Sequence, residues 1–293
     1  MRSARKNIYT MFAPNCQDEF NLRRKHLRLS HDFFDFLLIS YIVIYIFSEE
    51  KFMQHILGRV RRCVEDYHMI EPGETVAVGV SGGKDSLLTL VALARLRAFY
   101  PVAFQVHAIT LETGTPGMCF DAVADLCREL EVPYTRISVP VYQIVFEERK
   151  EKNPCSLCAK LRRGSLNTAL GELGISKIAL GHHFDDAVET MLMNLLFEGR
   201  IGCFQPVTYL DRSGITQIRP LLYCHEDEVR RAAERLRLPV VQNPCPANGS
   251  TRRQEVKELL VQLEQRYPNL RQKIFGAVQR YPLYGWNLEE IEK

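Results

Sequence analysis

The sequence has no hydrophobic run long enough to cross a membrane and almost no excess of charge. Its longest apolar stretch, from Phe33 to Phe47, is interrupted by Asp35 and Ser40 and is shorter than the ~20 residues that a spanning helix needs. Lys and Arg number 38 against 35 Asp and Glu, so the net charge of +3 does not by itself indicate a nucleic-acid-binding protein. Internal repeats and low-complexity segments are also lacking. These absences favour a globular protein of one or two domains, for which 293 residues are ample.

The first fifty residues differ from the rest of the chain. Basic residues at positions 23–28 precede the apolar stretch, which lies late for a signal peptide and is not followed by a small-residue cleavage site. Three interpretations stay open: an extension outside the functional domain, a membrane-associating helix, or an integral part of the fold. We expect residues 1–51 to lie outside the functional domain, which then occupies residues 52–293 and begins with a helix near Met53. We expect no membrane partner.

The segment Ser81-Gly82-Gly83-Lys84-Asp85-Ser86 is the most informative part of the sequence. It follows the apolar run from Thr75 to Val80 and precedes apolar residues at helical spacing, so the pattern predicts a buried strand, a glycine turn and a helix. Glycines allow successive backbone N–H groups to point at one anion, and the helix that follows directs its positive end at the same place. A phosphate group is the expected ligand of all six residues, and Lys84 adds a positive charge beside it.

This segment lacks the spacing of two better-known phosphate loops. It has neither the four residues that separate the two glycines of a Walker A loop nor the third glycine of the dinucleotide fingerprint. It resembles instead the SGGxDS signature of the PP-loop ATPases, which implies binding of ATP and its cleavage between the α and β phosphates.

Strand-like and helix-like segments alternate from residue 75 onward, which predicts an α/β fold with a doubly wound, mainly parallel sheet. Ligands bind such sheets beyond the carboxyl ends of the strands, where the phosphate loop lies. After the first strand, the expected strands are 103–109, 134–139, 177–180, 217–219 and 239–242. The expected helices are 86–97, 120–130, 157–173, 185–197, 226–236, 252–266 and 268–280.

Nine cysteines in a chain of this length do not indicate a small disulfide-rich protein, and an odd number with a close pair fits reduced thiols and metal ligation in the cytosol. Cys155 and Cys158 form a Cys-x-x-Cys pair, which alone is compatible with a zinc half-site, a redox dithiol or coincidence. If Cys245 joins them, three thiolates hold a metal or cluster with one open coordination position. A proline before Cys155 and before Cys245 favours exposed, extended loops. The remaining six cysteines are expected to be inert, partly buried thiols: Cys16, Cys63, Cys119, Cys127, Cys203 and Cys224.

A third motif, Gly181-His182-His183-Phe184-Asp185-Asp186, follows a predicted strand and opens a predicted helix. Asp185 and Asp186 can simply cap that helix. Alternatively they face the nucleotide phosphates, and because two carboxylates would repel them, Mg²⁺ is implied as the bridging ion. One of the pair could also act as a general acid or base. For His182 and His183, a ligand or base role and a backbone-organising role both stay open.

Basic residues gather near the cysteines and would form one positive rim if the cysteine segments meet. Such a rim is typical of binding to a phosphate backbone, although solvated helix faces carry the same residues. The residues are Arg149, Lys150, Lys152, Lys160, Arg162, Arg163, Arg252, Arg253 and Lys257.

Taken together, the motifs resemble the tRNA 2-thiocytidine synthetase family, from about Met53 to Arg280. The resemblance rests on residues 66–70, 78–87, 155–164, 177–186 and 218–221. It implies an adenine nucleotide α-hydrolase-like PP-loop fold and a cytoplasmic tRNA sulfurtransferase. Such an enzyme adenylates the C2 oxygen of a pyrimidine, here expected to be an anticodon-loop cytidine, and replaces it with sulfur. ATP, Mg²⁺ and a [4Fe–4S] cluster on Cys155, Cys158 and Cys245 are the implied cofactors.

The same resemblance assigns roles to the motif residues. Ser81 to Ser86, with Gly181 and His182, would bind ATP, and Lys84, Asp185 and Asp186 would serve catalysis. The implied partners are tRNA and a sulfur donor such as a cysteine desulfurase, and the oligomeric state stays open, a homodimer included. Asn248 stands where better-known members have a further cysteine, which indicates a divergent branch.

Two other functions stay open from the sequence. Another PP-loop enzyme, such as a tRNA-lysidine synthetase or an amide-forming ligase, would need ATP but no cluster. A non-catalytic metal-cluster RNA-binding protein would need the cysteines but would not release pyrophosphate and AMP.

Overall fold

The computed structural model describes residues 51–149, 154–245 and 252–280. The chain forms two compact units, Met1–Lys51 and Phe52–Lys293, and the second contains nearly all of the described residues. Several features named above lie outside the described residues: the apolar stretch from Phe33 to Phe47, Cys16, Lys150, Lys152 and Asn248.

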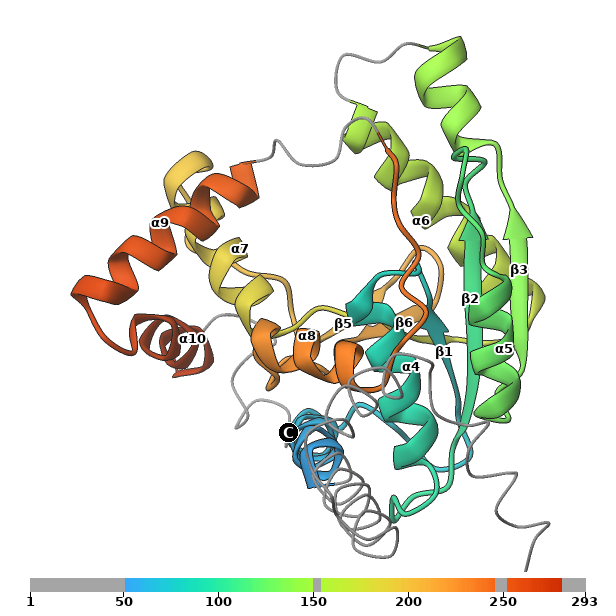
Figure 1. Ribbon diagram of the computed structural model, residues 1–293, viewed down its shortest axis with the longest axis horizontal. Helices are drawn as coiled ribbons and strands as arrows, with labels where there is room; N and C mark the ends of the chain where they lie inside the picture. Colours follow the sequence, from blue (N-terminus) through green and yellow to red (C-terminus); the bar gives the residue numbers. More distant parts are fainter. Residues whose placement is uncertain (1–50, 150–153, 246–251, 281–293) are drawn as a thin grey trace, which may run out of the picture. The chain divides into compact units, whose positions relative to one another are not determined.

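Six strands form one sheet in the order β3-β2-β1-β4-β6-β5 (Figure 1). All neighbours pair in parallel except β5, which pairs antiparallel with β6 at one edge. The bounds are β1 Thr75–Gly79, β2 Gln105–Glu112, β3 Tyr134–Ser138, β4 Lys177–Ala179, β5 Val207–Leu210 and β6 Ile215–Ile218. The doubly wound, mainly parallel α/β fold is therefore confirmed.

Helices connect the strands and continue beyond them. Residues 52–66 are helical and precede β1, as the pattern near Met53 predicts. The remaining bounds are α4 Lys84–Leu96, α5 Asp121–Glu129, the π-helix η1 Gln143–Glu148, α6 Pro154–Glu172, α7 Phe184–Phe197, α8 Glu226–Arg235, α9 Arg252–Arg266 and α10 Leu270–Arg280. No helix among these described segments is long and apolar enough to cross a membrane.

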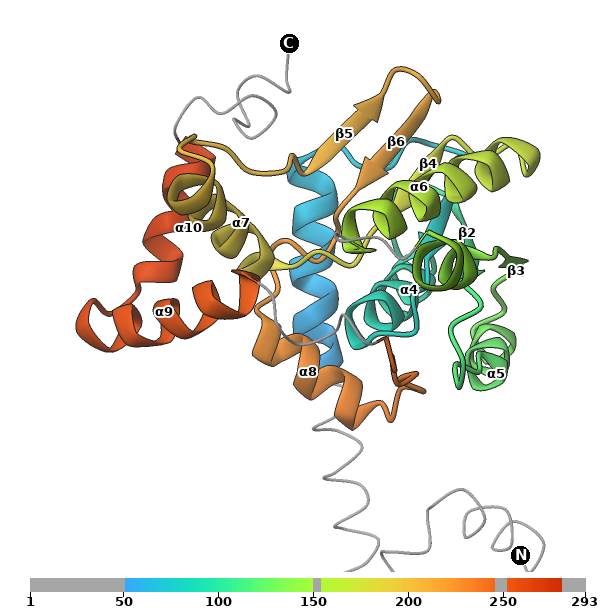
Figure 2. The same ribbon diagram turned by 90° about the horizontal axis from the view of Figure 1, so that it is seen from above.

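The sheet separates two hydrophobic cores because successive side chains of a strand point to opposite faces. Val76 and Val78 of β1 belong to the larger core, together with α4 and much of helix 52–66. Ala77, between them, belongs to a smaller core in which Leu170 of α6 packs against Ile178 of β4. Beside the sheet, α7, α9 and α10 pack against one another (Figure 2).

One expected strand is absent from the structure, and one observed strand was not expected. The predicted strand at 239–242 does not form, because Val241 donates its backbone N–H to Gly82 O at 2.9 Å instead of joining the sheet. β5 was not predicted, because its four residues are partly exposed and carry no continuous apolar run. Most predicted helix and strand ends agree with the structure within about two residues, as expected for pattern-based boundaries.

Gly181 brings the turn after β4 into contact with the beginning of α4. A Cβ atom at this position would lie 2.8 Å from the carbonyl carbon of Asp85 and 2.9 Å from the backbone nitrogen of Ser86. Because these are backbone atoms at the start of a helix, they cannot move aside as the end of a flexible side chain could. Only glycine fits here, and the starts of α4 and α7 therefore lie close together.

Replacing Gly181 with alanine is expected to lower the free energy of unfolding by about 1–3 kcal/mol, since the added methyl group forces the two helix starts apart. Gly171 in α6 is the matched control, because a Cβ there meets no atom within 4 Å. Gly171→Ala should raise the free energy of unfolding by about 0.5 kcal/mol through its better helix propensity. Urea unfolding of both variants measures the contrast, and equal effects would contradict the close-contact argument.

Candidate active site

The phosphate loop between β1 and α4 is shaped by two serines. The Ser81 and Ser86 hydroxyl oxygens lie 3.1 Å apart, and Ser86 Oγ also accepts the Ser81 N–H at 3.1 Å and donates to Gly83 O at 2.9 Å. Gly82 has φ +84°, and a Cβ there would lie 2.7 Å from Val241 Cβ. The serines and Val241 thus fix the path of the loop, and glycine is required at position 82 for both conformation and space.

Lys84 and Asp85 open α4 with different surroundings. The Lys84 ammonium lies 3.0 Å from Asp85 Oδ1 and 3.4 Å from Glu226 Oε1 at the start of α8. Asp85, in contrast, lines the cavity described next. The predicted phosphate-binding lysine is therefore held beside the loop by two carboxylates.

One cavity of about 850 Å³ connects the phosphate loop with the cysteines. Its wall includes the carboxyl ends of β1 and β2, the turn after β4 and the first turns of α6. The predicted site residues that line it are Ser81, Gly83, Asp85, Ser86, Gly181, His182, Asp186, Cys155, Cys158 and Cys245. Residues from three separate motifs thus face the same space.

The paired cysteines were expected in an extended loop, but the structure places them in a helix. Pro154 is the first residue of α6, a position where the missing N–H costs nothing, and Cys155 and Cys158 follow in the first turn and a half. Cys245 lies in a loop, where its N–H donates to Asn243 Oδ1 at 3.1 Å. The helix start presents both thiols of the pair to the cavity.

The electrostatics of Cys158 also relate the three thiols. Burial raises the pKa of the Cys158 thiol, Arg162 opposes this, and Cys245 and Cys155 raise it further. Within the described residues, no three His, Cys, Asp or Glu side chains converge tightly enough to hold a single metal ion. An iron–sulfur cluster differs from a single ion, because each cysteine binds a different iron atom and the thiols need not converge on one point. Three thiols around one end of the cavity are therefore suitable ligands for such a cluster.

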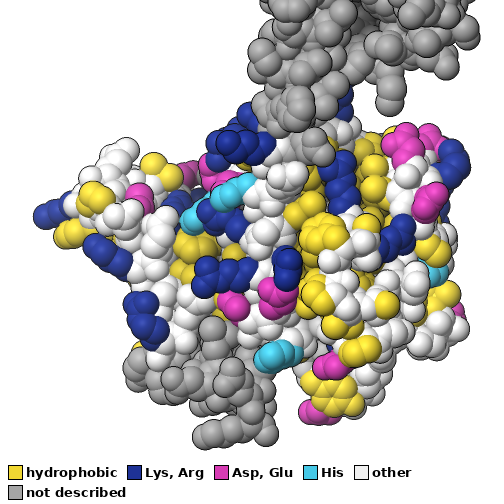
Figure 3. Space-filling view, turned by 90° about the horizontal axis from the view of Figure 1, so that it is seen from below, with side chains coloured by type: hydrophobic (Ala, Val, Ile, Leu, Met, Phe, Trp, Pro, Cys, Tyr) yellow, Lys and Arg dark blue, Asp and Glu magenta, His cyan; other side chains and the backbone are white. Residues whose placement is uncertain are grey.

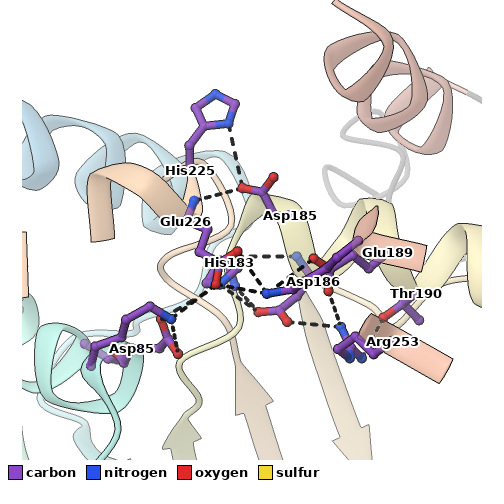
Figure 4. A network of polar contacts seen from close by, with 12 residues as sticks. Asp85, His183, Asp185, Asp186, Glu189, Thr190, His225, Glu226 and Arg253 are labelled. Atoms are coloured by element: carbon purple, nitrogen blue, oxygen red, sulfur yellow. Dashed lines mark hydrogen bonds and ion pairs between the residues drawn. The ribbon is translucent and has the colours of Figure 1, made fainter. Parts of the chain in front are cut away.

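Asp185 and Asp186, adjacent in sequence, have separate environments (Figure 4). Asp186 lines the cavity and accepts the His183 N–H at 3.0 Å, and His183 Nδ1 accepts the Asp186 N–H at 3.4 Å. Asp185 is buried away from the cavity lining, where it accepts from Arg271 at 2.7 Å and from the Glu226 N–H at 2.8 Å. The structure therefore brings only one of the two predicted carboxylates to the cavity.

His183 is buried and caps α7, in agreement with the backbone-organising alternative. His182 lines the cavity, and its ring lies 4.9 Å from that of Phe204. Burial, with a smaller contribution from the nearby Arg219 charge, lowers the pKa of His182 to about 4. Its imidazole is consequently uncharged near neutral pH and adds no positive charge to the cavity.

A chain of ion pairs extends from Asp186 to the C-terminal helices (Figure 4). Arg253 of α9 lies 3.1 Å from Asp186 Oδ1 and 3.0 Å from Glu189 Oε2, and Lys257 lies 3.0 Å from Glu226. The Glu189 side chain is fully buried, which raises the pKa of its carboxyl, while Lys257 and Arg253 oppose that rise. Glu189 was missed in the sequence, although its position three residues after Asp186 on an otherwise apolar helix face was a usable signal.

The predicted basic rim divides into two groups. Arg162 and Arg163 line the cavity beside Cys158, whereas Arg253 and Lys257 are occupied with carboxylates. On the face drawn in Figure 3, Lys and Arg side chains are scattered among hydrophobic and acidic ones instead of forming one patch. Arg253 and Lys257 are therefore engaged in ion pairs with acidic residues of α7 and α8, and one rim formed by all nine residues stays a prediction.

Most of the remaining cysteines fit the expectation of inert thiols. Burial raises the pKa of Cys127 to about 11 and that of Cys203 and Cys224 to about 12. Cys63 is also fully buried. Cys119 differs, because it is exposed.

A parallel sheet with a glycine-rich phosphate loop at its carboxyl edge defines a phosphate-binding α/β domain, and comparison with known proteins agrees. A family model described as a PP-loop domain matches residues 53–264. The tRNA-cytidine(32) 2-sulfurtransferase of Dechloromonas aromatica is 37% identical over 78% of this chain and 81% of its own length, and that of Geobacter sulfurreducens is 38% identical over 80% and 93%. The chain belongs to the PP-loop family, in the branch of these tRNA 2-thiocytidine synthetases, and the resemblance found in the sequence is confirmed.

A solved structure supports the same family. The U34-tRNA thiolase NcsA from Methanococcus maripaludis, described with its [4Fe-4S] cluster, superimposes with a TM-score of 0.64 at 27% identity. The match covers 78% of each chain. The fold around the cavity is thus shared with a protein that contains such a cluster.

Replacing Arg253 with alanine is expected to lower the free energy of unfolding by about 3 kcal/mol near pH 7, since it leaves the buried Glu189 carboxylate without its shortest ion pair. The pKa of Glu189 is raised in the folded state, so the folded protein takes up a proton before the unfolded chain does as pH falls. Protonation removes the Glu189 charge, which in this variant has lost its pairing with Arg253 and retains only the longer contact with Lys257. The deficit should therefore shrink in urea unfolding at about pH 5.

Two variants serve as controls for this prediction. Adding Glu189→Gln to Arg253→Ala should recover part of the lost stability, because no buried charge remains. Arg230→Ala removes an exposed arginine paired only with Glu234 and should change the free energy of unfolding by less than about 0.5 kcal/mol. A deficit that is the same at both pH values and in the Glu189→Gln background would contradict the role given to Glu189.

Proposed function

We propose that this protein thiolates tRNA: it uses ATP to adenylate the C2 oxygen of a cytidine, which is then replaced by sulfur. One observation carries the proposal, namely that the phosphate loop and the three cysteines line a single cavity. An ATP-dependent ligase without sulfur chemistry needs only the phosphate loop, and a non-catalytic cluster protein needs only the cysteines. The curated relatives, which are named for cytidine 32, make an anticodon-loop cytidine the proposed target.

Binding of the ATP phosphates falls to the loop and the start of α4. Anions can be bound there by the backbone N–H groups around Gly82 and Gly83 and by the positive end of α4, without a charged side chain. Lys84 stabilises the negative charge that develops as pyrophosphate leaves. His182 is neutral and lines the same cavity, so it can bind the nucleotide through a hydrogen bond without adding charge.

Asp85 and Asp186 are the proposed ligands of Mg²⁺. Both line the cavity, and carboxylate oxygens suit this hard cation, which would reduce their repulsion of the phosphates. Asp186 is held by the His183 N–H and by Arg253. Asp185, which is buried against Arg271, is proposed to position the starts of α7 and α8 and not to bind metal.

Cys155, Cys158 and Cys245 are the proposed ligands of a [4Fe–4S] cluster, which fits a set of three thiols at one cavity end. A cluster with three protein ligands supplies an iron with an open coordination position for sulfur. Arg162, beside Cys158, adds positive charge to this end of the cavity and favours anionic sulfur there.

The bonds exchanged in the reaction balance as follows. The C2 oxygen of the cytidine attacks the α-phosphorus of ATP, the bond to the β-phosphate breaks, and pyrophosphate leaves. A sulfur nucleophile at the oxidation level of sulfide then adds to C2, the C2–O bond breaks, and AMP leaves with the oxygen. A cysteine desulfurase is the expected source of the sulfur, which it carries as a persulfide, so a two-electron reductant such as a thiol must first bring this sulfur to the level of sulfide. The cytoplasm is the expected location. A homodimer stays an open prediction.

The direct test is nucleoside analysis of tRNA from a strain that lacks the gene. We expect 2-thiocytidine to be absent, to return with the wild-type gene, and not to return with Cys245→Ala. The purified Cys245→Ala protein should still bind ATP, because the substitution removes only a thiol and leaves every group of the phosphate loop in place. The Cys119→Ala protein, which changes an exposed cysteine outside the cavity lining, should restore thiolation fully. An unchanged nucleoside profile, or thiolation by a cluster-free variant, would overturn the proposal.

The roles of the adjacent aspartates can be separated. Asp186→Asn should raise the Mg²⁺ concentration needed for half-maximal pyrophosphate release about tenfold or more, because it removes an anionic ligand. Asp185→Asn should leave the Mg²⁺ requirement unchanged and instead lower the melting temperature, because it weakens the buried pair with Arg271. The opposite pattern would assign the metal to Asp185.

A further inference from the structure

Three Phe and Tyr side chains line the cavity, and two of them have no place in either hydrophobic core. Phe120 is buried in the larger core and contacts the phosphate loop, where a Cβ at Gly82 would lie 3.1 Å from its ring. Tyr142 and Phe146, beside and within η1, are half-buried and belong to neither core. Their exposure to the cavity is therefore not explained by packing of the fold.

The two rings form a pair with free space around it. Their centroids lie 5.0 Å apart and their planes are tilted by 35°, within the range of separations that aromatic pairs favour. Tyr142 also lines a second cavity of about 360 Å³ with Pro116 and Pro140, so cavity space borders it on more than one side. Phe146 lines the larger cavity but not the second one, so its ring borders the space that the phosphate loop and the cysteines also line.

The backbone of η1 holds this pair in place. Val145 is fully buried and anchors the segment, and Arg149 donates to Ile144 O at 3.0 Å, a wide turn that π-helices make. Residues four apart lie near one another on such a helix. π-Helices are rare and are often retained at functional sites. η1 packs against α6, whose first turns carry Cys155 and Cys158, so the aromatic pair and the cysteines border the same end of the cavity.

The ligand that fits these features is a planar, uncharged heteroaromatic ring. Nucleotides of RNA loops are bound by splaying the base out of the strand and stacking it on an aromatic side chain. Arg162 and Arg163 line the same cavity and can neutralise the phosphates that flank such a nucleotide. A base stacked on Phe146 also lies in the space shared by the phosphate loop and the cysteines, where the proposed reaction requires its C2 atom.

We propose that Phe146, backed by Tyr142, is the stacking platform for the target pyrimidine of the RNA loop. The inference rests on the proposed function and adds to it the residue that binds the base. Stacking of one base on an aromatic ring corresponds to roughly a tenfold or greater change in affinity.

The test combines a change in the protein with a change in the RNA. The RNA is a synthetic anticodon stem-loop with either cytidine or an abasic site at the target position, and its affinity for the full-length protein is measured under anaerobic conditions. Wild-type protein should bind the cytidine loop about tenfold more tightly than the abasic loop. Phe146→Ala should bind both loops equally, at the wild-type affinity for the abasic loop, and Phe146→Trp should restore the difference.

The control variant is Phe99→Ala, which removes an exposed ring that lines no described cavity and should retain the full tenfold difference. ATP binding and melting temperature should match the wild type in every variant. If Phe146→Ala still distinguishes the two loops, or weakens both by the same factor, the platform assignment is wrong while tRNA thiolation by the wild type still supports the proposed function. If the wild-type protein thiolates no tRNA, the proposed function fails, and the stacking inference fails with it.

Discussion

The contact between Gly181 and the first turn of α4 is the constraint on which the site depends. β1 and β4 are parallel neighbours, so the helices that follow them begin at the same sheet edge. Without a side chain at Gly181, the turn after β4 touches the backbone of Asp85 and Ser86, and two positive helix ends share one small space. That space attracts anions, and Lys84 and Arg253 balance the charges of the Asp85 and Asp186 carboxylates there.

Local sequence patterns predicted the phosphate loop, the parallel sheet and most helices, because each depends on residues close together in the chain. The segment with Val240 and Val241 shows where such patterns mislead. Its apolar, β-branched residues predicted a strand, yet Val241 is apolar because it packs on Gly82, and its N–H bonds to that glycine. β5 was missed for the opposite reason, since a short, half-exposed edge strand needs no apolar run.

Contacts between distant segments decided the rest of the site. Asp185 and Asp186 are equivalent in a sequence motif, but about 100° separates consecutive residues on a helix. One side chain therefore meets the cavity and the other meets Arg271 of α10, a partner 86 residues away. Arg253 and Lys257 were expected in an RNA-binding rim for the same reason: nothing local reveals that α9 folds back on α7, where Glu189 is buried.

The two ends of the cavity belong to different parts of the fold, and their alignment depends on the smaller core. The nucleotide end is built from the sheet and α4, whereas the cysteines and Arg162 belong to α6, against which η1 packs. Leu166 of α6 both lines the cavity and packs on the small core, in which Leu170 meets the sheet residues Ala77 and Ile178. Because such packing is close and resists deformation, it fixes the distance between the two ends of the cavity, where the proposed reaction requires the activated base and the sulfur. In the proposed reaction an adenylated base must meet sulfur before water, and the aliphatic side chains beneath α6 contribute to this by holding the two ends of the cavity at a fixed separation.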